Sequence, residues 1–296
     1  ICLLVNTLCQ TPSLHARRRL RRKTVSWPIV FLALATLFLT SCFEPREGCL
    51  DIEATNFDAA ADKNCCCTYP KLQLEVLPRF DSLVWKPDTA YQYAPGELFR
   101  LKSIVFYLSD FQLVQNGTTL TVSDTLPFQV WDATGDTVRR TLTNDILLVR
   151  RTATQYTPGT FRPSGIFESI RFRVGIPDNA QQVIPGLSPE AHPLRLQGEN
   201  LWLGRDTGYV ALKLVLTRDT FPTTVPDTLV FSRPDFGGTV IQQNISLNHE
   251  SGYDFRVKLT ANYRELFRNV QLSTADISTI KQQMVANLPN IFLVSQ

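Results

Sequence analysis

Metal binding through histidine and methionine is the first chemistry to consider for the residue types of this chain. Imidazole nitrogens and soft sulfur atoms are the natural copper ligands of proteins. Beyond residue 41 the chain has two histidines, His192 and His249, and one methionine, Met284. His249 begins a His-Glu-Ser-Gly sequence typical of a turn, where a surface histidine is ordinary, and Met284 falls on the expected core face of a helix. The two histidines are the candidate metal ligands, and this part of the chain cannot supply a three-histidine site.

Cysteines provide a second candidate chemistry. Four of the seven cysteines, Cys49, Cys65, Cys66 and Cys67, lie within 19 residues, and none occurs in the 229 residues that follow. In an exported protein such a cluster favours disulfide bridges that staple a small module. A four-sulfur metal site is the alternative, although the two separated Cys-x-x-Cys pairs typical of zinc are absent.

The same short segment contains oxygen donors that suit a calcium ion. Carboxylate and amide oxygens are the ligands that calcium prefers. The closely spaced donors are Asp51, Asn56, Asp58 and Asp62. The alternative is that these residues form turns and a solvated acidic surface. The segment has no long apolar period, so we expect it to need its bridges to fold.

An export signal precedes the cysteine cluster. Six basic residues lie between Arg17 and Lys23, an apolar run of 11 residues covers 29–39, and Thr40-Ser41-Cys42 follows. Spanning a bilayer takes about 20 residues, so the run indicates a signal peptide and not an anchor. Leu39 to Cys42 resembles a bacterial lipobox, where cleavage precedes a cysteine that receives a lipid. We expect a leader and signal at 1–41, lipidation at Cys42, and an outer-membrane lipoprotein on the periplasmic or surface face.

The charge balance argues against a nucleic-acid partner. The whole chain has a net charge of +3, and removal of the six basic residues before Cys42 changes it to −3. Nucleic-acid binding requires a clustered basic surface, which a mildly acidic domain does not indicate. The Gly-x-Ser-x-Gly elbow of hydrolases is also absent, and we do not expect an enzyme.

From Lys71 onward, short alternating segments predict an all-β domain. Asn116-Gly117 between two such segments is a strong hairpin signal, because both residues tolerate positive φ. Strands are expected at 71–77, 104–115, 118–122, 126–131, 145–149, 169–174, 208–216, 228–231, 240–247 and 254–261. Many short strands with little helical periodicity predict an antiparallel β-sandwich over 71–296, preceded by a tether and cysteine-stapled module at 42–70.

One helix is expected near the C-terminus. Ser273 or Thr274 could cap it, and Pro289 follows its expected end at about residue 287. Its apolar residues recur every three or four positions on one face: Ile277, Ile280, Met284 and Leu288. The apolar segment 291–294 is expected to return to the sheet or to cover an edge.

A connection of about 30 residues between two expected strands is the segment best placed to carry function. It runs from Pro177 to Gly208. It holds His192, Glu199, Trp202, Arg205 and Asp206. A loop tryptophan beside charged residues is either a binding aromatic or a packing lid, so Trp202 is the candidate functional aromatic.

Three segments of the chain resemble the MbnP family, the methanobactin-associated copper-binding proteins. They are Leu101–Asp110, Arg171–Pro177 and Leu201–Tyr209. The resemblance extends from Lys71 to the C-terminus. It implies an exported β-sandwich that binds copper through histidines. In some members a partner dihaem enzyme of the peroxidase type oxidises a tryptophan to kynurenine.

The cysteine segment resembles a second family, a short acidic cysteine module common in surface proteins of Bacteroidetes. Gly48-Cys49-Leu50-Asp51 and Cys67-Thr68-Tyr69 match that module. The Cys65-Cys66-Cys67 triplet departs from its usual Asp-Gly-Ser-Cys ending.

The copper ligands of the MbnP family transfer poorly to this chain. The family has Asn-His where Gln181-Gln182 stands here, and His-x-Gly-Gly where the chain has Asp235-Phe-Gly-Gly. The family's Trp-x-Trp positions hold Leu203 and Arg205, one residue away from Trp202. We expect a lipid-anchored MbnP-like protein whose copper ligands are largely missing. The alternative is a surface adhesion or ligand-binding module that uses the 177–208 connection and no metal.

Overall fold

Alternation of apolar and polar residues builds two sheets that enclose the main core. The computed structural model describes residues 44–196, 198–236 and 239–295. Cys42 and the expected leader at 1–41 lie outside these residues. Residues 46–296 form one compact unit.

The larger sheet has eight strands, with β6 at its centre. Its central order is β14-β13-β6-β12-β15, and β5, β7 and β10 also pair with β6. The strands are β5 (Ala90–Ala94), β6 (Glu97–Gln115), β7 (Thr118–Thr121), β10 (Leu147–Val149), β12 (Gly165–Val174), β13 (Val210–Thr217), β14 (Asp227–Ser232) and β15 (Val240–His249). Asn116 and Gly117 have φ of 50° and 73° between β6 and β7, which confirms the predicted hairpin.

The smaller sheet has five strands in the order β11-β3-β16-β17, with β4 beside β3. They are β3 (Lys71–Phe80), β4 (Leu83–Val84), β11 (Gln155–Thr160), β16 (Phe255–Asn262) and β17 (Phe292–Ser295). β3 and β16 are parallel, whereas the other pairs within the two sheets are antiparallel. The predicted all-β sandwich is confirmed, with one parallel pair added. β17 confirms the expected return of the chain to the sheet.

The larger sheet is buried on both faces at its centre. Ile104, Phe106 and Leu108 of β6 pack into the main core, while Val105 and Tyr107 face a second, smaller core. The continuous apolar run in β6 has this cause, since a strand covered on both faces loses its alternation.

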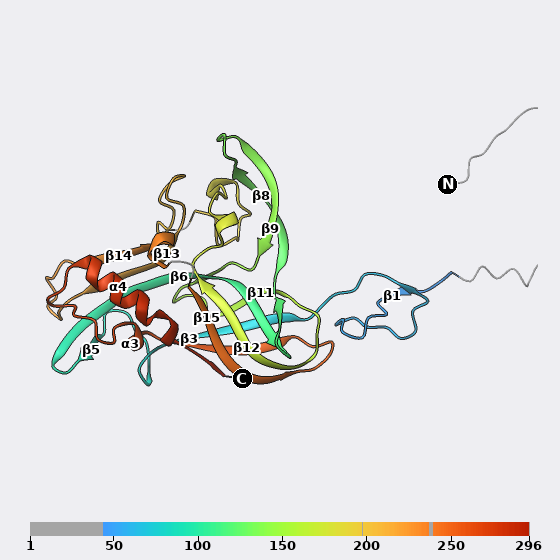
Figure 1. Cartoon of the computed structure of the whole chain (residues 1–296), viewed down its shortest axis with the longest axis horizontal. Helices are drawn as coiled ribbons and strands as arrows, with labels where there is room; N and C mark the ends of the chain where they lie inside the picture. Colours follow the sequence, from blue (N-terminus) through green and yellow to red (C-terminus); the bar gives the residue numbers. More distant parts are fainter. Residues whose placement is uncertain (1–43, 197, 237–238, 296) are drawn as a thin grey trace, which may run out of the picture. The chain divides into compact units, whose positions relative to one another are not determined.

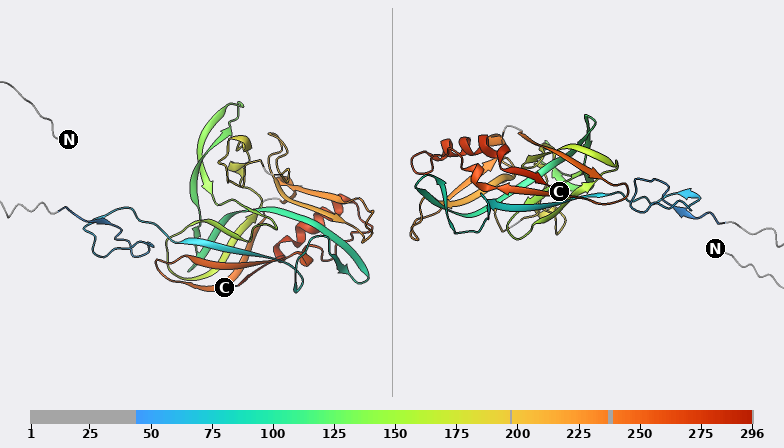
Figure 2. Two further views of the ribbon diagram at one scale, coloured as in Figure 1. Left: turned by 180° about the vertical axis from the view of Figure 1, so that it is seen from behind. Right: turned by 90° about the horizontal axis from the view of Figure 1, so that it is seen from below.

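The smaller core lies under a segment that we call the lateral lobe. It consists of the hairpin of β8 (Asp124–Trp131) and β9 (Thr137–Asn144) together with the connection 175–209. Figure 1 shows β8 and β9 beside this connection, on the side of the larger sheet away from β3, and Figure 2 shows the same grouping from behind. The connection contains two short 3-10 helices, η1 (Asp178–Ala180) and η2 (Pro185–Leu187).

The predicted C-terminal helix is present as α4 (Ile277–Asn287) and is followed by η3 (Leu288–Asn290). Its cap is Asp276, whose carboxylate accepts the Thr279 N–H at 3.0 Å, so the expected caps Ser273 and Thr274 were wrong. Two four-residue helices, α2 (Arg233–Phe236) and α3 (Tyr263–Leu266), were not predicted. Within the described part of the chain, no helix has the length and apolarity needed to cross a bilayer.

The cysteine module is held by one disulfide and a two-stranded pairing. Cys49 is bonded to Cys67, and β1 (Glu47–Gly48) pairs with β2 (Lys63–Asn64). Of the four cysteines predicted to form bridges, Cys49 and Cys67 are bonded to each other, while Cys65 and Cys66 are free thiols in this structure. The module contacts the sandwich through Ser251, whose hydroxyl donates to the carbonyl of Ile52 at 2.6 Å.

Candidate functional site

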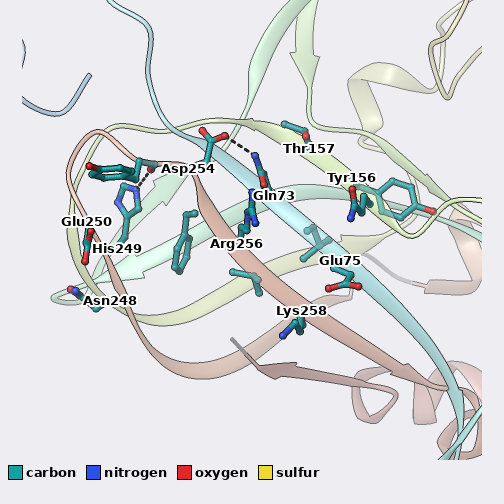
Figure 3. A pocket seen from close by; sticks show the side chains of 15 residues that line it. Gln73, Glu75, Tyr156, Thr157, Asn248, His249, Glu250, Asp254, Arg256 and Lys258 are labelled. Carbon is teal, nitrogen blue, oxygen red and sulfur yellow. Dashed lines mark hydrogen bonds between the residues drawn. The ribbon is translucent and has the colours of Figure 1, made fainter. Parts of the chain in front are cut away.

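A polar groove of about 830 Å³ lies on the outer face of the smaller sheet. Gln73 and Glu75 of β3 stand beside Arg256 and Lys258 of β16, in register with one another (Figure 3). Their neighbours Leu72 and Leu74 point into the core on the opposite face. The alternation that builds the sandwich therefore places a row of amide, carboxylate, guanidinium and ammonium groups along one open surface.

Hydrogen bonds fix the orientation of the planar groups in this groove. The Gln73 amide nitrogen donates to the Asp254 carboxylate at 2.6 Å, and the Arg256 Nε donates to the Gln73 oxygen at 2.9 Å. The groove also contains one further cationic side chain, Lys258, and two further carboxylates, Glu75 and Glu250. Because both signs alternate along the groove, it provides directed donors and acceptors without a strong field of one sign.

The groove continues into a second hollow of about 760 Å³ beside the cysteine module. Tyr253, Asp254 and Arg256 line both hollows, and Thr55 and Tyr69 bring the module into the second one. The Tyr253 side chain is 67% exposed at this boundary. An exposed aromatic ring between two polar hollows provides an apolar face on which a ligand can stack.

His249, one of the two predicted metal ligands, lies in the wall of the groove but is fully engaged by the protein. Its Nδ1 lies 3.1 Å from the carbonyl oxygen of Pro163, and its Nε2 lies 2.7 Å from that of Tyr253. The ring is buried and packs against Phe161 and Phe255, with centroids 4.8 and 5.4 Å away. Since each nitrogen faces an acceptor, neither directs a lone pair toward the groove.

His192, the other predicted metal ligand, is buried in the lateral lobe. Its Nδ1 accepts the Leu194 N–H at 3.1 Å, so the proton resides on Nε2, which donates to the Asn144 side-chain oxygen at 2.7 Å. Its ring contacts Phe128 edge to face at 4.8 Å. Burial lowers the pKa of His192 to about 4. The two histidines belong to different cores, and the fold does not bring them together.

Trp202 belongs to an aromatic stack that the sequence did not reveal. It lies against Trp131 at the end of β8, with ring centroids 5.7 Å apart and planes 18° apart. It also contacts Tyr209, whose ring is 4.8 Å away. Both tryptophans are half-buried, so the stack joins the hairpin of the lateral lobe to the connection and leaves part of each ring at the surface. Trp131 was missed because it was assigned only as the end of a strand.

The acidic pair Asp110 and Asp145 was also missed. Asp145 is 2% exposed; one carboxylate oxygen accepts the Phe111 N–H at 2.9 Å and the other has no hydrogen-bond partner. Burial raises the pKa of Asp145 to about 6, and the neighbouring Asp110 adds to the shift. Asp110 itself pairs with Arg173 at 2.9 Å. This pair lies at a bend in β6 where Asp110 has a φ of 56°.

The expected calcium ligands of the cysteine module are used in local hydrogen bonds. Asp51 accepts the hydroxyl of Tyr69, and Asp58 pairs with Arg46. Asn56 binds the backbone on both sides of Cys67, and the Asp62 carboxylate accepts the Arg46 N–H. Across the residues that the structure describes, no group of three or more histidine, cysteine, aspartate or glutamate side chains is arranged to hold a metal ion.

Comparison with known proteins places these observations in a family. The MbnP family model matches residues 69–284. The chain belongs to the MbnP family. A search of curated proteins finds no match. Among solved structures, MbnP from Methylosinus trichosporium aligns with a TM-score of 0.37 and 12% identity, covering 76% of this chain and 97% of that one.

Gln181 and Asp235 have structural roles in this chain. Gln181 is buried; its oxygen accepts the Tyr209 N–H at 3.1 Å and its nitrogen donates to the Ile176 carbonyl at 3.2 Å. A Cβ on Gly208 would lie 2.4 Å from that Gln181 oxygen, and Gly208 has a φ of +76°. Asp235 forms an ion pair with Lys281 at 2.8 Å. These side chains hold the connection and α2 in place.

Proposed function

We propose that this MbnP-family protein is a non-catalytic binding protein of the cell envelope that takes a polyhydroxylated ligand, such as a neutral oligosaccharide, in the groove of the smaller sheet. The observation that carries the proposal is the ordered polar row formed by Gln73, Arg256 and Asp254 beside the exposed ring of Tyr253. We propose that Cys42 and its lipid hold the domain at the membrane.

The chemistry of the groove favours a neutral ligand rich in hydroxyl groups. Amide, carboxylate and guanidinium groups present donors and acceptors in fixed planes, which suits pairs of neighbouring hydroxyls. Sugars also have apolar C–H faces that stack on aromatic rings such as Tyr253. A strongly charged ligand would meet groups of its own sign, since Glu75 lies beside Lys258 and Asp254 beside Arg256.

Copper binding through the two histidines has weaker support in this member. His249 has both ring nitrogens on carbonyl groups, and His192 is held in the lateral lobe by Asn144 and Leu194. A metal would have to displace these partners and leave buried polar groups unpaired, at about 1–3 kcal/mol each. We propose that the ancestral copper function is lost at these two positions.

The ligand proposal is tested by calorimetric titration of the full chain with a panel of neutral oligosaccharides, including cello-, xylo- and manno-oligosaccharides. Arg256→Ala is expected to weaken binding about 10- to 100-fold, because a charge-assisted hydrogen bond is worth roughly 1.5–3 kcal/mol. Tyr253→Ala is expected to weaken it further. Absence of binding to every member of the panel would overturn the proposal.

The control variant is Arg171→Ala on the larger sheet. Arg171 donates through Nε to Gln242 at 2.8 Å, a pairing like that of Arg256 with Gln73, but it does not line the groove. Equal loss of affinity in the two arginine variants would contradict the proposed location. Copper binding is tested by Cu(I) competition titration of the wild type and a His192→Gln, His249→Gln double variant. The two proteins are expected to have the same affinity for Cu(I). A tenfold or greater loss of affinity in the double variant would show that the histidines bind copper.

A further inference from the structure

Cys65 and Cys66 are adjacent thiols whose sulfur atoms lie 2.7 Å apart. This separation is well within the van der Waals contact of two sulfur atoms and close to bonding range. Cys66 is exposed and Cys65 is partly exposed. The other two cysteines of the described chain, Cys49 and Cys67, are already bonded to each other. Within the described residues, each of these thiols therefore has only the other as a disulfide partner.

The backbone around the pair is fixed by four contacts of the module. The Cys65 N–H donates to the Gly48 carbonyl at 2.9 Å, and the Asn56 side chain donates to the Cys66 carbonyl at 2.7 Å. Cys67, the next residue, is held by its disulfide and by the fold on its other side, where the Thr68 N–H donates to Asn56 at 2.8 Å. Cys66 has a φ of 58°, a left-handed turn conformation, and its sulfur lies against that of Cys65. The pair is thus preorganised.

We propose that Cys65 and Cys66 form an exposed redox-active pair that closes into a vicinal disulfide by exchange with a small disulfide donor. The proposal concerns the module and does not depend on the ligand or copper chemistry of the sandwich. It assigns the reactive positions within the module, which the cysteine count alone left open.

Exposure assigns separate roles to the two thiols. The hydrogen bond with Cys66, followed by desolvation and the Cys66 charge, raises the pKa of Cys65 to about 11. Cys65 therefore stays protonated near neutral pH, and the exposed Cys66 is the attacking nucleophile. Its thiolate attacks one sulfur of a disulfide such as oxidised glutathione, and the first glutathione leaves as a thiolate that takes up a proton.

Cys65 completes the exchange. As its proton is lost to solvent or to the departing group, its sulfur attacks the Cys66 sulfur of the mixed disulfide and expels the second glutathione. Two cysteine thiols are oxidised to one disulfide, and oxidised glutathione is reduced to two thiols. Because exposed disulfides are the more reducible ones, this bond is expected to open before Cys49–Cys67, whose Cys49 is 1% exposed.

The test uses the full chain incubated with oxidised glutathione, followed by alkylation and peptide mapping by mass spectrometry. The expected result is a peptide in which Cys65 and Cys66 resist alkylation and have lost two hydrogens, with Cys49–Cys67 intact. Graded reduction is expected to restore alkylation at the vicinal pair first. Persistent alkylation of both thiols under oxidised glutathione, or a Cys49 joined to Cys65 or Cys66, would overturn the proposal.

Two single variants test the order of attack. Cys65→Ser removes the resolving thiol, so a glutathione adduct is expected to accumulate on Cys66. In Cys66→Ser the adduct on Cys65 is expected to form at least about fivefold more slowly, since the less exposed thiol must attack. Retention of the Cys49–Cys67 bond in both variants shows that the module is folded. Equal adduct rates in the two variants would contradict the assigned roles.

Discussion

His192 in the lateral lobe and His249 in the wall of the groove are both buried, yet opposite kinds of partner hold their rings. His192 accepts a backbone N–H on one nitrogen and donates from the other, which suits the neutral ring. His249 faces a carbonyl oxygen from each nitrogen. The ring nitrogens of His192 therefore face one donor and one acceptor, whereas those of His249 face two acceptors.

The two histidines belong to regions of different kinds: the lateral lobe is closed, and the groove is open. The lateral lobe uses His192, Gln181 and an aromatic stack to close the smaller core against β6. The groove uses His249 only in its wall, where the ring anchors the 249–255 turn to Pro163, and leaves its polar row on the surface. Histidine content alone is therefore a poor guide to metal binding in this chain, because each ring has a structural role.

The largest expected effect is the loss of the His249 ring. His249→Ala removes the ring partner of the Pro163 and Tyr253 carbonyls and leaves a cavity between Phe161 and Phe255, so unfolding in urea is expected to show a loss of about 3–4 kcal/mol. His249→Gln keeps one donor and is expected to lose about half as much. Asn248→Ala, at the exposed neighbouring position, is the control. A loss of less than about 1 kcal/mol of unfolding free energy in His249→Ala would contradict the anchoring role of the ring.

The second prediction concerns His192 and acid. Its pKa is about 4 in the folded protein and about 6.5 when unfolded, so the folded state binds fewer protons between these values. The stabilisation that His192 contributes is therefore lost as pH falls from about 6.5 to 4, by about 3.4 kcal/mol for a difference of about 2.5 pKa units. Comparison of urea unfolding at pH 7 and pH 4.5 is expected to show that His192→Gln lacks this loss. An unchanged pH dependence in the variant would contradict it.

Asp145 is expected to change the stability with pH in the opposite direction and by a slightly smaller amount. Its folded pKa is about 6, above the ordinary value near 3.8, so the folded state holds an extra proton between them. Stability from this group is present below about pH 4 and is lost as pH rises through 6, by about 3 kcal/mol.

The matched variant for this carboxylate is Asp145→Asn, which keeps an acceptor for the Phe111 N–H. It is expected to be relatively more stable than the wild type at pH 7.5 than at pH 4.5, measured by urea unfolding at both values. In the wild type the Asp145 and His192 effects oppose each other, so its own profile is expected to be shallow. A constant difference between variant and wild type at both pH values would argue against the buried, protonated carboxyl.

Local patterns in the sequence predicted most of the fold. Alternation in β3 and β16, the Asn116-Gly117 turn and the apolar face around Ile280 and Met284 each have a local cause that a short window reveals. β9 was missed because its residues Thr137–Asn144 are mostly polar, and β11 because Pro158 and Gly159 break its strand pattern. β9 is held by the neighbouring strand β8 in a hairpin, whereas β11 is held by pairing with β3, which is distant in the sequence.

The candidate site was much less predictable than the fold. Trp202 was singled out, but its stacking partner Trp131 lies on another element, and no local spacing joins them. His249 was assigned to an exposed turn, whereas the three-dimensional fold buries its ring against phenylalanines from β12 and β16. The groove itself arises from the register of two parallel strands that are distant in sequence, which single-chain patterns do not encode.

The smallest expected effect tests how the lateral lobe is closed. Gln181→Ala removes the hydrogen bonds to the Tyr209 N–H and the Ile176 carbonyl and is expected to cost about 2 kcal/mol in urea unfolding, at about 1 kcal/mol per bond. Gln182→Ala is the control, since the neighbouring side chain is exposed and its loss is expected to cost less than about 0.5 kcal/mol. Near-ultraviolet circular dichroism is expected to change in the Gln181 variant only, because Tyr209 contacts Trp202. Oligosaccharide binding in the groove is expected to be the same in both variants, because the two regions lie in separate cores. An equal loss of unfolding free energy in the two glutamine variants would mean that packing alone closes the lobe.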